Sequence, residues 1–264
     1  MLEAIGLTKV FNPGTINEKI ALDNISLYLS PGDFVTVIGG NGAGKSTLLN
    51  CIAGVYRQEA GYILLDGKRL DRLSEHKRAR YLGRVFQDPL MGTAADMEIQ
   101  ENLALAKRRG QARGLAWGVT AGEKAEFRDK LAGLGLGLED RMTAKVRLLS
   151  GGQRQALTLL MATLKAPRLL LLDEHTAALD PKTARKVLEL SERFIAQMGL
   201  TCLMVTHNMR DAIAVGNRLI MMSQGKIILD VSGEEKKQLT VEQLVRLFSA
   251  KSGEDVINDR MMLG

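Results

Sequence analysis

One segment of the chain has the residue types and the spacing needed to hold a row of phosphates. It fits the pattern G-x-x-x-x-G-K-[ST], in which glycines let backbone N–H groups face phosphate oxygens, the lysine reaches the outer phosphates and the hydroxyl can ligate Mg²⁺. The alternative is a glycine-rich turn before a helix, but the flanking strand and helix that the motif requires are predicted here. The segment is Gly39-Gly40-Asn41-Gly42-Ala43-Gly44-Lys45-Ser46-Thr47.

This loop predicts binding of a nucleoside triphosphate with Mg²⁺, and by itself it does not separate a kinase, a GTPase, a helicase and a transport ATPase. A second feature, an acidic pair after an apolar run, predicts that the triphosphate is hydrolysed. Four leucines at 169–172 run into Asp173 and Glu174. A continuous apolar run is typical of a parallel strand buried on both faces, and ligands lie at the carboxyl ends of such strands. We therefore expect Asp173 to hold Mg²⁺ and Glu174 to polarise an attacking water as general base, rather than both lying in a solvated loop.

Composition excludes several other classes. At roughly 150 residues per domain, the 264 residues suggest one large domain or a domain with a subdomain. The 45% hydrophobic content excludes a largely disordered chain. The most apolar stretches, at 34–38, 169–172 and 201–206, are far shorter than a membrane span. The N-terminal segment, with an early Glu3, lacks the pattern of a signal peptide.

The cysteines and the charge point to few specific partners. Cys51 and Cys202 are too few for a disulfide framework or a zinc site, and their apolar neighbours predict burial in a reducing compartment. A net charge of +6 is compatible with nucleic acid, an anionic membrane or a polyphosphate ligand. Aromatic residues make up only 4% of the chain, which argues against base-stacking platforms.

The pattern of apolar residues predicts an α/β core interrupted by helices. Strands are expected where apolar residues alternate or run together, and helices where they recur every three to four residues. Expected strands are 2–10, 21–29, 33–38, 62–65, 84–87, 169–172 and 201–206, with a hairpin of 218–223 and 226–231 about Gln224-Gly225. Expected helices follow Gly44 and cover 97–106, 123–134, 181–198, 208–215 and 240–249.

Strand signals vanish between about 89 and 150. We therefore predict one domain over 1–264, with 1–88 and 151–231 as a nucleotide-binding core, 89–150 as a helical subdomain and 232–264 as a helical tail of unassigned role. Within the subdomain, the basic stretch at 107–118 is interpreted as a solvated loop with Trp117 packed; the alternative is a surface that meets anionic lipid headgroups.

A third motif, Leu149-Ser150-Gly151-Gly152-Gln153, resembles the signature sequence of ATP-binding cassette (ABC) ATPases, and the resemblance covers nearly the whole chain. Ser150 and the amides of Gly151 and Gly152 can form an anion-binding nest at a helix start. In that family, the nest binds the terminal phosphate of ATP held by a second subunit. The resemblance implies a P-loop NTPase core with a mixed sheet, an N-terminal antiparallel β subdomain and an inserted helical subdomain.

Further positions match the family in order. The resemblance implies that Phe11 stacks on adenine, where the family more often has Tyr, and that Gln87 senses Mg²⁺ and the terminal phosphate. It implies that His207 contacts the terminal phosphate and that Ala178-Leu179-Asp180 crosses to the partner subunit. The implied catalytic residues are then Glu174, His207 and Lys45, and the implied metal ligands are Ser46, Gln87 and Asp173.

The chain departs from the family at His175 and Ala177, since most members read DEPTSALD and this chain reads DEHTAALD. His175 adjoins the expected base and could tune it; the alternative is a subgroup marker without a proton-transfer role. This segment is similar in sequence to ATPases of bacterial importers that use a substrate-binding lipoprotein of the aromatic-amino-acid kind.

The resemblance implies an ATPase subunit that powers solute import, with amino acids as the candidate solutes. Its expected partners are a second copy of the chain, a transmembrane permease and an extracytoplasmic substrate-binding protein, without nucleic acid. Its expected place is the cytoplasmic face of the cell membrane, with ATP and Mg²⁺ as cofactors. The alternatives are an exporter ATPase, whose sequence would look nearly the same, a soluble ABC ATPase such as an iron–sulfur assembly factor, and a nucleic-acid-binding module suggested only by the net charge.

Overall fold

The computed structural model describes residues 1–111 and 118–252. The chain divides into two compact units, Met1–Arg78 with Leu200–Gly264, and Ala79–Gly199. These bounds differ from the predicted core and helical subdomain, whose limits remain a prediction. None of the helices in the described part of the chain is long and apolar enough to cross a bilayer.

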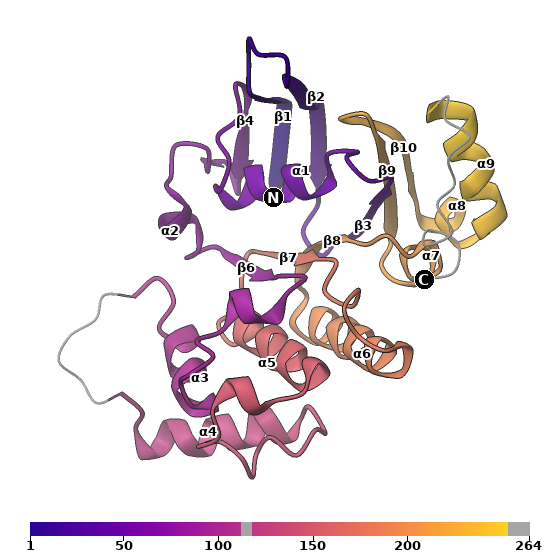
Figure 1. The fold of residues 1–264 in the computed structure, drawn as a ribbon. Coiled ribbons are helices and arrows are strands. Elements are labelled where there is room, and N and C mark those ends of the chain that lie inside the picture. Colours follow the sequence, from indigo (N-terminus) through magenta and orange to yellow (C-terminus); the bar gives the residue numbers. More distant parts are fainter. Residues whose placement is uncertain (112–117, 253–264) are drawn as a thin grey trace. The chain divides into compact units, whose positions relative to one another are not determined.

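The first unit opens with an antiparallel sheet of strand order β2-β1-β4-β5. Its edge strand β2 alternates buried and exposed side chains, as expected for a sheet with one face against a core. Its strands are β1 (Leu2–Phe11), β2 (Lys19–Leu29), β4 (Ala60–Leu65) and β5 (Lys68–Arg69). This sheet is the predicted N-terminal antiparallel subdomain (Figure 1).

The same unit carries four strands of a mixed sheet, in the order β10-β9-β3-β8. β3 pairs in parallel with both β8 and β9, and β9 pairs antiparallel with β10 through the predicted hairpin. Every residue of β3 is buried, which explains why its sequence is apolar apart from Thr36. The strands are β3 (Phe34–Gly39), β8 (Thr201–Val205), β9 (Arg218–Ser223) and β10 (Lys226–Ser232).

The first unit also contains five short helices within the described residues, and the C-terminal ones are anchored by buried side chains. The amphipathic α9 buries Leu244 and Phe248 in a cluster that includes Met209 and Ala212 of α7. Lys236 of α8 is buried and its ammonium donates to the carbonyls of Val215 and Gly216. The helices are α1 (Lys45–Ala53), α2 (Glu75–Arg78), α7 (Met209–Ala214), α8 (Gly233–Lys237) and α9 (Val241–Ser252).

The second unit combines two parallel strands with helices. β6 pairs with β7 so that Val85 lies opposite Leu172. The predicted strand at 84–87 begins and ends two residues earlier, which leaves Gln87 outside it because the chain bends there. The elements are β6 (Leu82–Val85), η1 (Pro89–Gly92), α3 (Ile99–Lys107), α4 (Ala121–Ala132), η2 (Val146–Leu148), α5 (Gly151–Thr163), β7 (Leu169–Asp173) and α6 (Pro181–Met198) (Figure 1).

Both cysteines are in the first unit, Cys51 on α1 and Cys202 on β8. Each is a buried, free thiol, as the sequence predicts. Burial raises the pKa of Cys51 to about 11 and also raises the pKa of Cys202, because a buried thiolate loses its hydration.

Candidate functional site: the phosphate loop and the acidic strand end

The phosphate loop leaves β3 at Gly39 and enters α1 at Lys45. A Cβ on Gly39, whose φ is 151°, would lie 2.2 Å from the carbonyl oxygen of Met222. A Cβ on Gly44, whose φ is 100°, would lie 2.4 Å from the carbonyl oxygen of Ala21. Any side chain at either position would collide with backbone, so both glycines are required by the close approach of β9 and β2.

Lys45 is folded back onto this loop. Its side chain is buried, and its ammonium donates to the carbonyls of Gly39 at 2.7 Å and Gly40 at 3.1 Å. A buried cation held by two loop carbonyls, beside glycines that leave the backbone uncovered, fits the outer phosphates of a nucleotide. The residues present therefore fit the predicted triphosphate.

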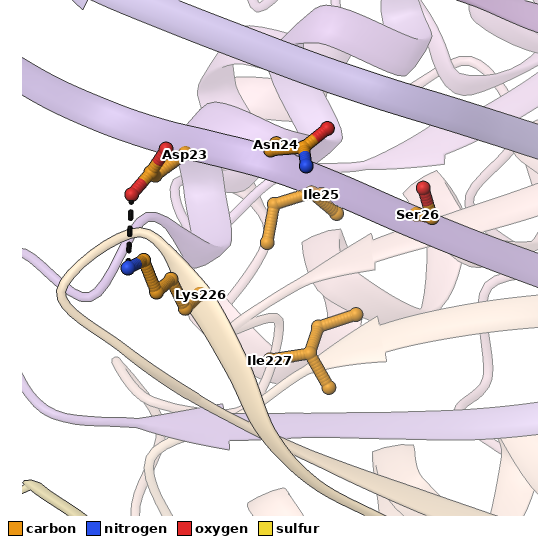
Figure 2. A pocket seen from close by; sticks show the side chains of 6 residues that line it. All are labelled: Asp23, Asn24, Ile25, Ser26, Lys226 and Ile227. Atoms are coloured by element: carbon orange, nitrogen blue, oxygen red, sulfur yellow. Dashed lines mark ion pairs between the residues drawn. The ribbon is translucent and has the colours of Figure 1, made fainter.

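The β9–β10 hairpin supports the loop from the side. The Gly225 N–H donates to the carbonyl of Ala43 at 3.1 Å, and the Asp23 N–H donates to the carbonyl of Gly225 at 2.9 Å. Figure 2 shows the ion pair of 3.1 Å between Lys226 and Asp23 that holds the hairpin on β2. A polar hollow of about 410 Å³ lies beside this pair, lined by Asp23, Asn24, Ile25, Ser26, Lys226 and Ile227.

Phe11 and His207 lie in the same unit as the phosphate loop. The Phe11 ring meets the Tyr56 ring nearly perpendicularly, at 84° with 5.2 Å between centroids. The Lys9 ammonium lies 5.3 Å from the Phe11 centroid, within the range of a cation–π contact. His207 follows β8 and directly precedes Asn208, which caps α7 by accepting the N–H groups of Arg210 and Asp211.

Asp173, at the end of β7, is ion-paired in the second unit. The Arg84 guanidinium on β6 lies 3.3 Å from the Asp173 carboxylate, and both side chains are largely buried. The same guanidinium stacks over the Phe86 ring at 4.4 Å. A carboxylate at this strand end suits Mg²⁺, a hard cation that prefers oxygen ligands, but here it already has a cationic neighbour.

The next residue, Glu174, has a left-handed backbone with φ of 45°. Non-glycine residues in this region cost free energy and gather at functional sites. Its neighbour His175 is fully buried, with Nε2 3.0 Å from the Ser191 hydroxyl on α6. Burial lowers the pKa of the His175 imidazole to about 4, so the ring is neutral near pH 7. This geometry favours the interpretation of His175 as a packed residue over one that tunes the base.

Gln87 is exposed in the bend between β6 and η1. The preceding residue, Phe86, is held in place because the buried Gln155 amide on α5 donates to its carbonyl at 3.0 Å. Asp88 caps η1 by accepting the N–H of Leu90. The segment that carries Gln87 is thus tied at both ends while the Gln87 side chain faces solvent.

The signature residues form the start of α5. Ser150 is its N-cap and accepts the N–H of Gln153, whose side chain accepts the Ser150 N–H in return. A Cβ on Gly152 would lie 2.0 Å from Cγ2 of Thr183 on α6. Gly152 is therefore also required for the close approach of α5 and α6, independently of any phosphate.

Asp180 is the N-cap of α6, where it accepts the N–H of Thr183 at 3.1 Å. Hydrogen bonds from Thr183 lower the pKa of the Asp180 carboxyl. This local role accounts for the residue at this position, and its contact with a partner subunit remains a prediction.

The basic stretch that begins at Lys107, the last residue of α3, makes internal contacts. Lys107 pairs with Glu126 at 2.5 Å, and Arg108 pairs with Glu123 at 3.0 Å. Arg109 donates to the carbonyls of Ala162 and Lys165 at the end of α5. These three cations stabilise the helices around them, which argues against the lipid alternative for this part. Arg113 and Trp117 lie outside the described residues.

The first unit thus contains Phe11, His207 and the whole loop 39–47, and the second contains the remaining predicted site residues. Those in the second unit are Gln87, Ser150, Gly151, Gly152, Gln153, Asp173, Glu174 and Asp180. Their joint arrangement around one nucleotide remains a prediction.

The sequence matches a family model described as ABC transporter over residues 22–177. The chain belongs to the ABC transporter family. It is 43% identical, over 94% of its length and 98% of the relative's, to a tyrosine transport ATP-binding protein of Clostridioides difficile. It is 36% identical, over 86% of its length, to the methionine import ATP-binding protein MetN of Corynebacterium diphtheriae, of which it spans 64%.

Solved structures of ABC cassettes confirm the predicted fold class. A dimeric post-hydrolysis state of the cassette MJ0796 with ADP and Pi matches 88% of this chain and 98% of that one, with a TM-score of 0.74 and 29% identity. The ADP conformation of the cassette MJ1267 matches 94% and 98%, with a TM-score of 0.77 and 26% identity. As an ABC ATPase the chain binds and hydrolyses ATP as a subunit of a transporter.

Three residues outside the predicted set make contacts at or beside the predicted site residues. Arg84 contacts Asp173, Gln155 holds the carbonyl before Gln87, and Lys19 reaches the phosphate loop. A charged residue at the start of the predicted strand 84–87 was a usable signal for Arg84. Lys19 could not be found in this way, because its position depends on the register of β1 and β2.

Proposed function

We propose that the chain is the ATPase subunit of a bacterial importer of amino acids, acting with a separate membrane permease. The observation that carries this proposal is the 43% identity to the tyrosine transport ATP-binding protein, which extends over nearly the full length of both chains. The similarity to MetN supports the same solute class. The chain then lies at the cytoplasmic face of the membrane, bound to its permease.

In this role the nucleotide is held by the loop 39–47, with adenine on Phe11 and Lys45 on the outer phosphates. Ser46, Gln87 and Asp173 would hold Mg²⁺, which would neutralise charge on the phosphates. Glu174 takes a proton from the attacking water, and His207 contacts the terminal phosphate. Ser150, Gly151, Gly152, Gln153 and Asp180 of one copy serve the nucleotide of the other copy.

Binding of ATP draws two copies together because ATP has a higher affinity for the closed pair than for the open one. Hydrolysis removes that difference and releases the pair. Motion of the pair is passed to the permease, and an extracytoplasmic binding protein supplies the solute.

The apolar tip after Gln87 supports a permease contact. Met91 is 70% exposed and Leu90 is 44% exposed on the short η1 turn, and exposed apolar side chains of this size mark interaction sites when they gather. Met91→Asp should therefore weaken coupling to the permease and leave the ATPase rate of the isolated chain unchanged. Met198→Asp, at a residue 41% exposed at the end of α6, is the matched control.

The experiment is an ATPase measurement on the complete complex with its permease and binding protein in lipid nanodiscs. Tyrosine, phenylalanine, methionine and a sugar are added in turn. The proposal expects an amino acid, and not the sugar, to stimulate hydrolysis, and expects accumulation of that amino acid inside proteoliposomes. Stimulation by none of the amino acids, or movement in the outward direction, would overturn it.

A further inference from the structure

Lys19 is a cation that reaches the phosphate loop from outside the motif at 39–47. It is the first residue of β2, and it lies opposite Phe11 in the register of β1 and β2. Its ammonium Nζ lies 3.0 Å from the point where a Cβ on Gly42 would be. Gly42, with φ of 78°, is one of the loop residues whose backbone faces the nucleotide in the family pattern.

The charge of Lys19 is not neutralised by its neighbours. Within residues 1–111 and 118–252, its ammonium makes no hydrogen bond or ion pair. Glu18, the adjacent acid, instead accepts the N–H of Gly14 at 2.6 Å. Lys226, on the hairpin that supports the loop, differs because it is paired with Asp23 (Figure 2).

The two loop lysines occupy different places. Lys45 extends under the loop to the carbonyls of Gly39 and Gly40, whereas Lys19 reaches the loop from the strand that pairs with Phe11. In a nucleotide, the α- and β-phosphates lie between the base and the terminal phosphate. A cation between the adenine-stacking ring and the loop therefore suits these inner phosphates, to which it makes a charge-assisted hydrogen bond.

We propose that Lys19 is a second phosphate-binding lysine of this ATPase, acting on the α- and β-phosphates of ATP and ADP. The inference rests on the proposed nucleotide site at residues 39–47. Two properties would distinguish such a lysine from one that is merely exposed. The contribution of Lys19 grows with the number of phosphates on the ligand, and it is retained by another cation of similar reach.

The test is a direct binding titration of the full chain, in EDTA, with ATP, ADP, AMP and adenosine. We expect Lys19→Gln to raise the Kd for ATP and ADP about tenfold, since a charged hydrogen bond of this kind contributes at that level. The Kd for adenosine should stay unchanged, and Lys19→Arg should restore most of the affinity for ATP. Added salt should reduce the difference between the parent chain and Lys19→Gln, because it screens an exposed charge.

Lys68→Gln is the matched control, since Lys68 is an exposed lysine of the same unit on β5. It should bind all four ligands as the parent does. An unchanged Kd for ATP in Lys19→Gln, or an equal loss for adenosine, would overturn the proposal. Lys45→Ala separates this from a failure of the nucleotide site: if the parent binds ATP and Lys45→Ala does not, the site stands whatever Lys19 does.

Discussion

At the scale of single residues, the end of β7 places two neighbouring side chains in opposite environments. Glu174 has a strained left-handed backbone, whereas His175 is buried and neutral against Ser191. Two adjacent residues thus have different roles, since Glu174 is the expected base and His175 is a packed residue. His175, where this chain differs from the common DEPTSALD sequence of the family, therefore has a packing role.

Glu174→Gln should lower the rate of ATP hydrolysis by about 10²–10⁴-fold, because an amide cannot take the proton of the attacking water. Affinity for ATP should be retained, since Gln keeps the size of the side chain. A steady-state phosphate-release assay beside a nucleotide titration checks both. Hydrolysis at the parental rate would remove Glu174 from the role of base.

His175 should make stability depend on pH. Its pKa is lowered from 6.5 to about 4 in the native chain, so the unfolded chain binds a proton between these values that the native chain does not. This contribution to the free energy of unfolding is complete above about pH 6.5 and is lost as the pH falls toward 4.

From about pH 7.5 to about pH 5, the parent should lose roughly 2 kcal/mol more than His175→Asn, which can still bond to Ser191 but does not titrate. Urea unfolding at both pH values measures the difference. His76 and His207 are present in both proteins, so the comparison isolates position 175. Equal pH dependence of the two proteins would contradict the buried, neutral assignment.

At the scale of elements, close approach explains several of the glycines that the motifs contain. Gly39 and Gly44 are confined by the backbones of β9 and β2, and Gly152 by Thr183 of α6. The signature motif therefore has a packing role in α5 beside its expected role at phosphate.

Gly152→Ala should destabilise the chain by about 1–3 kcal/mol, the usual cost of forcing an extra methyl into a packed contact. Thr183→Ser removes the Cγ2 atom that the new methyl would strike, so the double variant should recover most of the loss. Denaturant unfolding of the two single variants and the double variant gives the coupling energy. Additive losses would show that the contact is not the cause.

The elements were predictable where their pattern is long and were missed where it is short. Strands such as β3 and β7 are mostly apolar, and their ends place Gly39 and Asp173 at strand termini. The two-residue β5 and the four-residue α2 offer too few positions for a period to be seen. Arg84 with Asp173, and Lys19 with Gly42, are contacts between distant segments, which depend on strand register and not on local sequence.

At the scale of the whole molecule, the predicted site residues are divided between the two compact units. The family implies that Ser150, Gly151, Gly152, Gln153 and Asp180 of one copy reach the ATP held by the other copy when two copies of the chain associate. Association is therefore the property of the whole molecule that the proposed function most directly predicts.

The Glu174→Gln chain should form a stable dimer in MgATP, because it binds nucleotide but cannot hydrolyse it. Size-exclusion chromatography with light scattering distinguishes monomer from dimer. Lys45→Ala in the same background should remain monomeric, since it weakens nucleotide binding. A Glu174→Gln chain that stays monomeric at saturating ATP would contradict ATP-driven association of this subunit alone.

Both cysteines of the chain lie in the first unit, so alkylation of thiols reports on that unit only. The thiolate is the reactive form, and the raised pKa values of Cys51 and Cys202 mean that the folded chain should react slowly with iodoacetamide. Reaction then requires local opening, and its rate measures how often the unit opens. Because Cys51 is on the helix that begins at Lys45, bound ATP should slow its alkylation. The alkylation rate of this native thiol would then report nucleotide occupancy without any engineered probe.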